Sequence, residues 1–424
     1  MFNFKLSKTI WDVQWSFISL ATASLSHLLL RIVLGRELGP SGLGVYTLVF
    51  TMYMFGMQFA GFGIGSALTK YVAEFRDDNQ KVREYISSGM TGSLISGFII
   101  TIMLYLVSDF IAISIFHISE MSELLKIIAF CLPFIAIQKM VLGTLNGLRR
   151  MKSYAIINII QNVFVLVLSV YFVLILNTDV KGAVLGLTIP TIITSLFSII
   201  FIKNFVSTLS FSFTKSFQDV TWFGFYFVLA NSIGMINTQV DSMMIGHFLD
   251  AKNVGYYSVA TIVINGIILI PNSVHAAVAP SIAYFYGKSE YEKTTKFIQR
   301  IVLYVTVVII IISISIALFG KALIMLLFKN EFILAYSPLL ILLIGYTIYS
   351  PIHSVDCALL SIGKVNILYK ISLFCTIFNI IFNVLLISKY GILGAALSTS
   401  MSIIILSIFK LYFINKHLFN IKCT

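Results

Sequence analysis

The chain has 424 residues, of which 58% are hydrophobic and only 11% are charged, and its mean hydropathy is +0.97. A soluble domain averages about 45–50% apolar and about 25% charged residues, so this composition excludes a water-soluble globular protein. The formal charge of +12 does not indicate nucleic-acid binding, because the Lys and Arg residues stand in short clusters between apolar runs, as in the loops of a membrane protein.

Twelve apolar runs are long enough to cross a bilayer, since about 20 helical residues span its hydrocarbon core. They are too long and too continuous for barrel strands, so the spans are predicted to be helices. Residues 21–23 resemble a signal-peptidase site, but the first run continues to Leu34, and we expect a retained span. The predicted spans are 13–34, 43–70, 86–107, 124–146, 154–176, 182–202, 222–248, 254–284, 298–319, 334–361, 366–388 and 391–413.

The basic residues predict the orientation of these spans. With the N-terminus inside, 20 of the 29 Lys and Arg residues fall on the cytoplasmic side and 7 on the other, leaving Arg31 and Lys139 within spans. Cytoplasmic loops of membrane proteins carry this excess of positive charge. We therefore expect both termini in the cytoplasm and an even number of spans.

Two segments recur in the second half of the chain. Residues 35–47 share Gly, Leu, Gly and Tyr with residues 246–258 at a shift of 211, and residues 181–185 match 393–397 at a shift of 212. Two matches at nearly one shift indicate a duplicated six-span unit. Six spans return the chain to its starting side, so the halves form parallel repeats, an arrangement of transporters that bind substrate between them. The predicted fold is an all-α integral membrane protein with an N-terminal bundle (1–203), a cytoplasmic interfacial connector (204–221) and a C-terminal bundle (222–424).

Motifs for nucleotide, metal or disulfide chemistry are incomplete. Gly287-Lys288-Ser289 resembles the end of a P-loop, but Ile282 occupies the required upstream glycine position. The glycines of residues 61–65 lie in an apolar span, where close helix packing explains them better than dinucleotide binding. The four cysteines form no CxxC pair. We expect no cofactor and no metal.

Polar residues at membrane depth are costly in lipid and therefore indicate a transport pathway. Lys139 lies about two-thirds of the way along the fourth span, and a structural ion pair is its alternative role. His27 and Arg31 share a face of the first span, although Arg31 is close enough to the interface to snorkel. The seventh span carries a dense polar stripe. The candidates for a substrate-facing lumen are Lys139, Arg31, His27, Gln138, Asn231, Asn237, Gln239 and Asp241.

A second group of residues is a candidate for gating or ion coupling. His353 and Asp356 are three residues apart in the tenth span, directly after Pro351, and Asp241 is the third candidate. A satisfied interhelical contact is the alternative for the pair. His275 in the eighth span fits either a packed or a functional role.

The segment Arg36 to Pro40, followed by Gly44-Val45-Tyr46, resembles the polysaccharide biosynthesis export proteins. These are the O-antigen or Wzx-type flippases of the multidrug/oligosaccharidyl-lipid/polysaccharide transporter superfamily. Residues 241–246 and 254–260 and Gly363-Lys364 are similar to the same family. The resemblance extends over nearly the whole chain in span number and length.

This resemblance implies two six-helix bundles around a V-shaped cleft in the plasma (inner) membrane. It also implies transport, without covalent chemistry, of a polyprenyl-diphosphate-linked oligosaccharide from the cytoplasmic to the outer leaflet. The cargo is an O-antigen, capsule or other surface polysaccharide unit. Such proteins work beside a polysaccharide polymerase or ligase and glycosyltransferases, among membrane lipids. In this reading Arg31 and Lys139 attract the diphosphate, and the polar residues of the seventh span, with Gln138, hydrogen-bond sugars.

Two alternatives stay open from the sequence. A cation-coupled multidrug exporter of the same superfamily also has twelve spans, and Asp241 and Asp356 would bind its Na⁺ or H⁺. A membrane-embedded glycan polymerase or transferase is the other alternative, but it needs catalytic groups on a large outer loop. The longest predicted outer loop, residues 108–123, offers only Asp109, Glu120 and Glu123.

Overall fold

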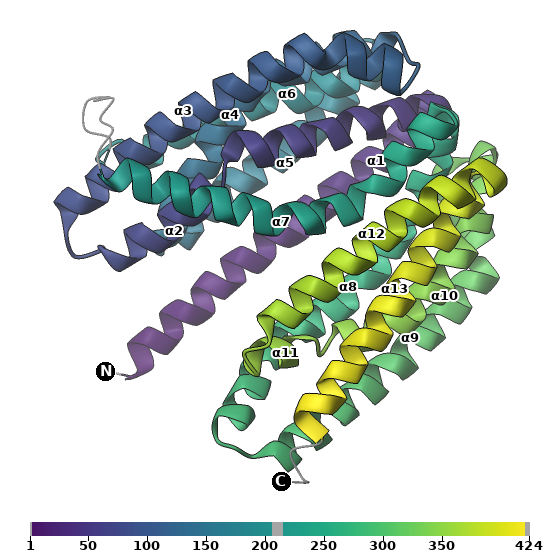
Figure 1. The fold of residues 1–424 in the computed structure, drawn as a ribbon. Coiled ribbons are helices and arrows are strands. Elements are labelled where there is room, and N and C mark those ends of the chain that lie inside the picture. Colours follow the sequence, from purple (N-terminus) through teal and green to yellow (C-terminus); the bar gives the residue numbers. More distant parts are fainter. Residues whose placement is uncertain (1, 206–214, 420–424) are drawn as a thin grey trace. The chain divides into compact units, whose positions relative to one another are not determined.

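The computed structural model describes residues 2–205 and 215–419, with the side chains of residues 11–205 and 215–417. These residues form helices joined by short turns, and no strand occurs among them (Figure 1). The helices pack into two units, Met1–Met235 and Ile236–Thr424. Eleven helices in the described ranges are long and apolar enough to cross a membrane. The chain is therefore a multi-pass helical membrane protein, as its composition predicts.

The first unit contains six complete helices and the beginning of a seventh. Short π and 3₁₀ segments, Phe110–Ile115 and Ile200–Ile202, extend two of them. The helices are α1 (Phe2–Gly61), α2 (Ile64–Glu74), α3 (Asn79–Asp109), α4 (Glu120–Gly147), α5 (Met151–Leu174), α6 (Asp179–Ile199) and α7 (Lys215–Phe248), which passes into the second unit after Met235.

The first two predicted spans lie in one candidate membrane segment, Trp11–Glu74, whose 64 residues are far more than one crossing needs. Within α1, Gly39 has φ 64° and ψ −173°, a conformation that only glycine adopts readily, and Pro40 follows it. Proline lacks a backbone N–H and fixes φ, so the α1 helix is interrupted here. A second break, at Phe62 and Gly63, separates α1 from α2.

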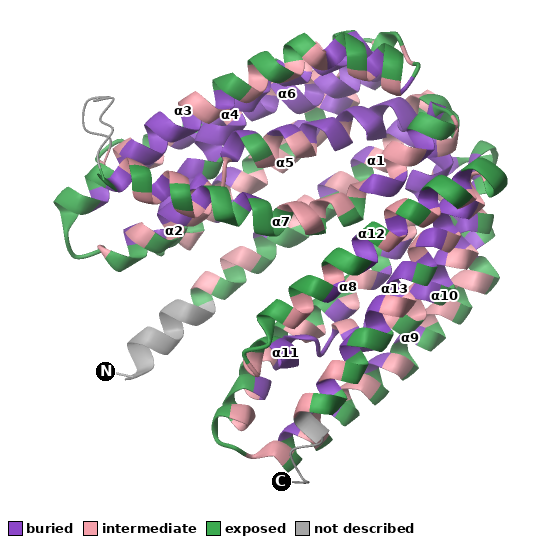
Figure 2. Ribbon diagram, in the orientation of Figure 1, coloured by how far each residue is buried: buried purple, intermediate pink, exposed green. Residues whose placement is uncertain are grey.

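Helix α4 forms the centre of the first unit. In the most apolar stretch of 18 residues in α4, 72% of the residues are buried, against 11% in that of α3. Figure 2 shows the buried and exposed residues along both helices. Met140 and Leu145 of α4 pack with Ile64 and Leu68 of α2 and Ile86 of α3 in one apolar cluster. Because the environment of a membrane helix is lipid, close packing rather than hydrophobicity must hold these helices together.

The second unit continues from the end of α7. It contains α8 (Ala251–Gly287), α9 (Tyr291–Phe328), a 3₁₀ turn (Asn330–Ala335), α10 (Tyr336–His353), α11 (Cys357–Ser361), α12 (Val365–Tyr390), α13 (Ile392–Ile414) and a final π turn (Asn415–Phe419). Helices α10 and α13 approach closely at Gly345, where an added Cβ would lie 2.8 Å from the Cα of Ser400. Helix α9 is the most exposed, with Leu318 70% and Leu326 72% exposed, as expected for a lipid-facing helix.

The chain divides at a different place from the predicted connector. Of residues 204–221, residues 206–214 lie outside the described part, and 215–221 form the first turns of α7. The boundary between the units instead falls inside α7, between Met235 and Ile236.

The predicted repeat has a structural counterpart in the two units. Pro40, the first residue after the break in α1, and Ala251, the first residue of α8, are 211 positions apart. Tyr46 and Tyr257 follow at the same spacing, and both are buried, at 2% and 1% exposure. The repeat therefore places a tyrosine at the same point of each unit.

Candidate functional site

Asp241 of α7 is the centre of a buried polar cluster in the second unit. Its carboxylate accepts hydrogen bonds from Tyr257 OH of α8 at 2.7 Å, Asn383 Nδ2 of α12 at 2.8 Å and Thr399 Oγ1 of α13 at 2.5 Å. Asp241 is 8% exposed and forms no ion pair in the described part of the chain. Neutral donors alone therefore surround this carboxylate.

A second layer of polar groups supports these donors. Asn383 Nδ2 also reaches Asn379 Oδ1 at 3.1 Å, and Asn379 Nδ2 lies 3.3 Å from both Ser398 Oγ and Thr399 Oγ1. Asn383 Oδ1 is buried without a hydrogen-bond partner. Carboxylate, amide and hydroxyl oxygens are what a hard cation coordinates, and a carboxylate also takes a proton. The cluster thus has the chemistry of a cation or proton site.

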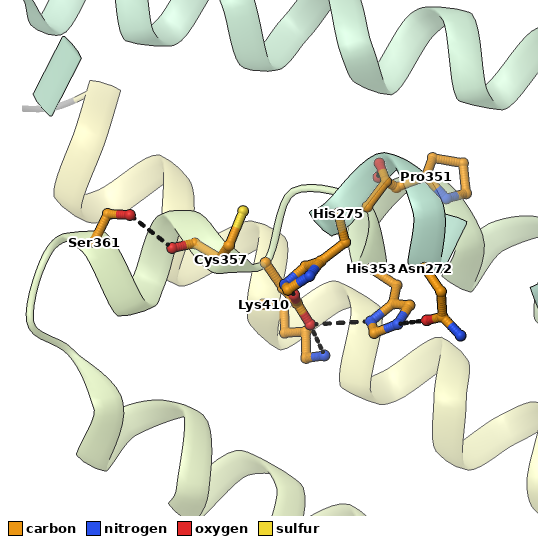
Figure 3. A network of polar contacts seen from close by, with 9 residues as sticks. Asn272, His275, Pro351, His353, Cys357, Ser361 and Lys410 are labelled. Carbon is orange, nitrogen blue, oxygen red and sulfur yellow. Dashed lines mark hydrogen bonds and ion pairs between the residues drawn. The ribbon is translucent and has the colours of Figure 1, made fainter. Parts of the chain in front are cut away.

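Asp356 is the centre of the second buried network (Figure 3). Its oxygens lie 2.6 Å from Lys410 Nζ of α13, 3.2 Å from His353 Nδ1 of α10 and 3.1 Å from His275 Nε2 of α8. The side chains of Asp356 and Lys410 are 9% and 6% exposed. Unlike Asp241, this carboxylate has a buried cation, Lys410, as its partner. The sequence spacing placed His353 near Asp356, and the two are in contact, but it did not indicate Lys410.

Lys410 is one of the 20 basic residues counted for the cytoplasmic side, and the sequence did not show that it pairs with Asp356. The sequence contained an indication that Lys410 has a buried partner, because residue 410 falls inside the predicted span 391–413. A lysine at that depth needs either an interface within reach or a buried acid. The helical pattern alone could not show that Asp356 lies beside it, because the two residues are 54 positions apart.

Arg31 and His27 of α1 face an aromatic row on the part of α1 that follows the break at Gly39. The Arg31 guanidinium lies 5.6 Å from the centre of the Phe50 ring, and His27 meets the same ring edge-on at 5.8 Å. Tyr46 stacks against Phe50 at 6.1 Å. Arg31 forms no salt bridge with a carboxylate in the described part of the chain, and the contact with the Phe50 ring is its cation–π interaction.

Lys139 of α4 is the other cation at membrane depth in the first unit. Its side chain is exposed while its neighbours Gln138 and Met140 are buried, and it has no partner among the described residues. Its stem packs against the glycine run 61–65: a Cβ on Gly61 would lie 3.7 Å from Lys139 Cγ, and one on Gly65 2.5 Å from the Lys139 carbonyl oxygen. These glycines therefore serve close packing, as predicted, and the structure brings them beside Lys139.

Gln138 does not occupy the position expected for a substrate-facing residue. It is 0% exposed, and its Nε2 donates to Gln161 Oε1 of α5 at 2.8 Å, while Gln161 Nε2 lies 3.4 Å from Thr191 Oγ1 of α6. It is a packing contact between α4 and its neighbours. Sequence position showed its depth in the membrane but not the side of the helix on which it lies.

The polar stripe of α7 is divided between surface and interior. Asn231 is exposed and donates to the carbonyl of Phe227 in its own helix at 2.9 Å, and Asn237 is also exposed. Gln239 is partly exposed, whereas Asp241 is buried. Asn237 and Asp241, four residues apart in α7, therefore differ in exposure. No group of three or more His, Cys, Asp or Glu residues suited to a metal ion occurs in the described part of the chain.

Comparison with known proteins assigns the chain to a family. The model of the family described as polysaccharide biosynthesis protein matches residues 12–286. The chain belongs to this family. A second model, MatE, matches residues 225–385. The resemblance inferred from residues 36–46 and 241–260 is thereby confirmed.

Several relatives match this member of the polysaccharide biosynthesis protein family over most of their length. It is 24% identical to a putative O-antigen transporter of Shigella flexneri, covering 92% of this chain and 94% of that one. It is 25% identical to the capsular polysaccharide biosynthesis protein CapF of Staphylococcus aureus, covering 95% and 98%. It is 24% identical to the probable low-salt glycan biosynthesis flippase Agl15 of Haloferax volcanii, covering 90% and 78%.

Two solved structures share the fold. The lipid II flippase MurJ in an inward closed conformation superposes with a TM-score of 0.79 at 17% identity, covering 95% of this chain and 87% of that one. An inward-facing multidrug resistance MATE family transporter superposes with a TM-score of 0.78 at 16% identity, covering 96% and 99%. At this level of identity the superpositions establish the fold.

Proposed function

We propose that the protein is a transporter that flips a polyprenyl-diphosphate-linked oligosaccharide from the cytoplasmic to the outer leaflet of the plasma (inner) membrane. The observation that carries this proposal is the pair of cations, Arg31 and Lys139, that stand at membrane depth in the first unit without a carboxylate partner. Relatives named as an O-antigen transporter, a glycan flippase and a lipid III flippase support it. The cargo is a repeat unit of O-antigen, capsule or another surface polysaccharide.

The proposed architecture has twelve membrane helices in two six-helix bundles around a V-shaped cleft. The break at Gly39 and Pro40 divides the 64-residue first segment into two spans, which raises eleven candidate segments to twelve. The excess of basic residues on alternate loops supports both termini in the cytoplasm. We propose that the bundles correspond to the two sequence halves, 1–203 and 222–424.

Transport needs no covalent chemistry in this proposal. Carrying one bare sugar hydroxyl into hydrocarbon costs about 2–7 kcal/mol, so even a short glycan needs a hydrated, polar route. Arg31 and Lys139 attract the diphosphate, and the exposed amides of Asn231 and Asn237 hydrogen-bond the sugars. The isoprenoid tail stays in the bilayer. A membrane potential that is negative inside favours outward movement of an anion by about 2.3 kcal/mol per charge per 100 mV.

Asp241 is the proposed ion-coupling residue. A buried carboxylate that has only neutral donors carries an uncompensated charge, and binding of Na⁺ or H⁺ removes that charge. This feature also supports a second candidate function, a cation-coupled multidrug exporter, together with the MatE match over residues 225–385. The proposed partners are the lipid-linked glycan, membrane lipids, and a polysaccharide polymerase or ligase with glycosyltransferases.

The test compares the native chain with Lys139→Ala and Arg31→Ala in proteoliposomes that contain a lipid-diphosphate-linked oligosaccharide. The measurement is the fraction of glycan accessible to an external glycosidase over time. Lys181→Ala is the matched control, because Lys181 pairs with Glu123 at an exposed position. Protein-dependent exposure of glycan that both lumen variants slow and the control retains supports the proposal. Native protein that moves no glycan but expels cationic dyes along an ion gradient supports the exporter instead.

A further inference from the structure

The Asp356 network lies at a break in the tenth predicted span, between α10 and α11. Helix α10 ends at His353, residues 354–356 form a turn, and α11 begins at Cys357 (Figure 3). Pro351 lies one turn before, where it removes a backbone donor. His275 of α8 and Lys410 of α13 both reach Asp356 within this turn. Side chains from α8, α10 and α13 thus contact the turn at residues 354–356, where the helical backbone is interrupted.

His353 lies between two oxygen atoms. Its Nδ1 is 3.2 Å from Asp356 Oδ2 and its Nε2 is 2.8 Å from Asn272 Oδ1. A carboxylate and an amide oxygen accept hydrogen bonds and cannot donate them, so both ring nitrogens must carry hydrogen, which makes the ring an imidazolium. A neutral ring satisfies the same two neighbours only if the Asn272 amide turns by about 180° and presents its NH₂ group.

The surrounding groups favour one proton at this position and disfavour a second. The rings of His275 and His353 are stacked, 5.8 Å apart and 13° from parallel, so two imidazolium ions would repel each other. His275 needs only one N–H to reach Asp356. The network is also faced by Tyr349, whose ring stacks on His353 at 4.9 Å, and by Cys357 and Cys375, which interact electrostatically with Asp356 and Lys410, respectively. Lys410 offsets the charge of Asp356, which leaves the charge of His353 as the variable one.

We propose that His353 is a proton-binding site that sets the strength of the contact between α8 and α10 at the break. With the proton bound, Asp356 and Asn272 hold His353 through a charge-assisted hydrogen bond. When the proton leaves, Asn272 reorients and the bond to Asp356 becomes neutral. Histidine is the side chain whose charge most readily changes near neutral pH, and the side chains of His275 and His353 are partly exposed, at 31% and 21%.

The proton itself is observed by NMR of protein labelled with ¹⁵N in its six histidines. His353→Gln identifies the signal, and His117→Gln, an exposed histidine far away in the chain, is the matched control. We expect two protonated ring nitrogens on His353 at acidic pH and loss of the Nε2 proton, but not the Nδ1 proton, within the range of about pH 5–8. A ring that stays neutral, or stays charged, throughout that range overturns the proposal.

The effect on the break is measured at Cys357, which directly follows Asp356 and is 2% exposed. The other three cysteines are replaced by alanine, and the rate at which a maleimide alkylates Cys357 is measured with His353 and with His353→Gln at each pH. The ratio of the two rates removes the effect of thiol ionisation, which is common to both proteins. A charge-assisted bond is stronger than a neutral one by about 1 kcal/mol. We therefore expect the ratio of native to variant rates to rise about fivefold between pH 5.5 and 8.

His353→Arg keeps a charge at every pH and serves as the second variant. Its rate ratio to His353→Gln should stay constant over the same range. A native ratio that changes by less than about twofold, or an equal change in His353→Arg, would show that His353 does not control the break. Neither measurement uses a transport assay, so these outcomes do not depend on the proposed substrate.

Discussion

The two units carry opposite charges beside tyrosines that occupy equivalent positions of the predicted repeat. In the first unit, Tyr46 stacks on the Phe50 ring that lies under the Arg31 guanidinium. In the second, Tyr257, 211 positions later, donates its hydroxyl to the Asp241 carboxylate. The shift of 211 is that of the predicted repeat, so the two tyrosines occupy equivalent positions of the repeat but have neighbours of opposite charge. In the proposed function the first unit offers a cation to an anionic substrate, and the second offers an anion to a coupling ion.

The units also differ in how they treat their lysines at membrane depth. Lys139 in the first unit has no partner among the described residues, whereas Lys410 in the second is paired with Asp356 at 2.6 Å. Removing a buried charge that has an ion-pair partner destabilises the fold, whereas an exposed charge without a partner at membrane depth can bind a ligand. Stability measurements should therefore separate the two lysines before any transport is measured.

The largest effect is expected on breaking the buried pair. Lys410→Met removes the lysine that pairs with buried Asp356 and should lower the free energy of unfolding in detergent by about 3–5 kcal/mol. Asp356→Asn combined with Lys410→Met should recover most of this loss. Lys139→Ala should stay within about 0.5 kcal/mol of the native chain, because it removes no partner. Equal losses in Lys139→Ala and Lys410→Met would contradict the distinction between the two lysines.

A smaller loss is expected at the glycine contact that supports Lys139. A Cβ on Gly143 would overlap the carbonyl oxygen of Gly65, so Gly143→Ala should destabilise the protein by about 1–3 kcal/mol. Gly266 has open space around it and provides the control, Gly266→Ala, with no loss. Thermal unfolding in one detergent measures both. No difference between the two variants would argue against close packing of α2 on α4.

Removal of a lumen cation should slow flipping while stability is unchanged. A hydrogen bond to a charged group contributes about 1.5–3 kcal/mol, so Lys139→Ala or Arg31→Ala should reduce the initial rate by about tenfold or more. Lys139→Arg keeps the charge and should retain most of the rate. If the rate follows the size of the side chain instead of its charge, the diphosphate assignment fails.

The smallest change tests the Asp241 cluster. Tyr257→Phe removes one of the donors and should lower the free energy of unfolding by about 0.5–1.5 kcal/mol. Asp241→Asn should abolish the response of transport to an ion gradient. The equivalent Tyr46→Phe in the first unit lies beside a cation, and we expect it to leave the gradient response intact. Comparing the rates with and without a Na⁺ or H⁺ gradient distinguishes these two tyrosines.

The sequence predicts depth in the membrane better than it predicts neighbours. Ten of the predicted spans each correspond to one candidate segment, and the break between the other two follows from Gly39 and Pro40. The polar residues at membrane depth include Asp241 and Asp356, the centres of both buried networks. However, the hydrophobic pattern cannot show which side of a helix meets another helix. For that reason Gln138 was named as a lumen candidate although it is a buried contact, and the pairing of Lys410 with Asp356 was missed.

Glycan movement by the native chain tests the central claim most directly. Proteoliposomes with a fluorescent lipid-diphosphate-linked oligosaccharide in the inner leaflet are given a membrane potential that is negative inside, and quenching of the outer leaflet is followed. The account predicts protein-dependent transfer that becomes faster as the potential increases. Transfer no faster than in protein-free vesicles, from protein that is folded and still expels cationic dyes, would contradict it.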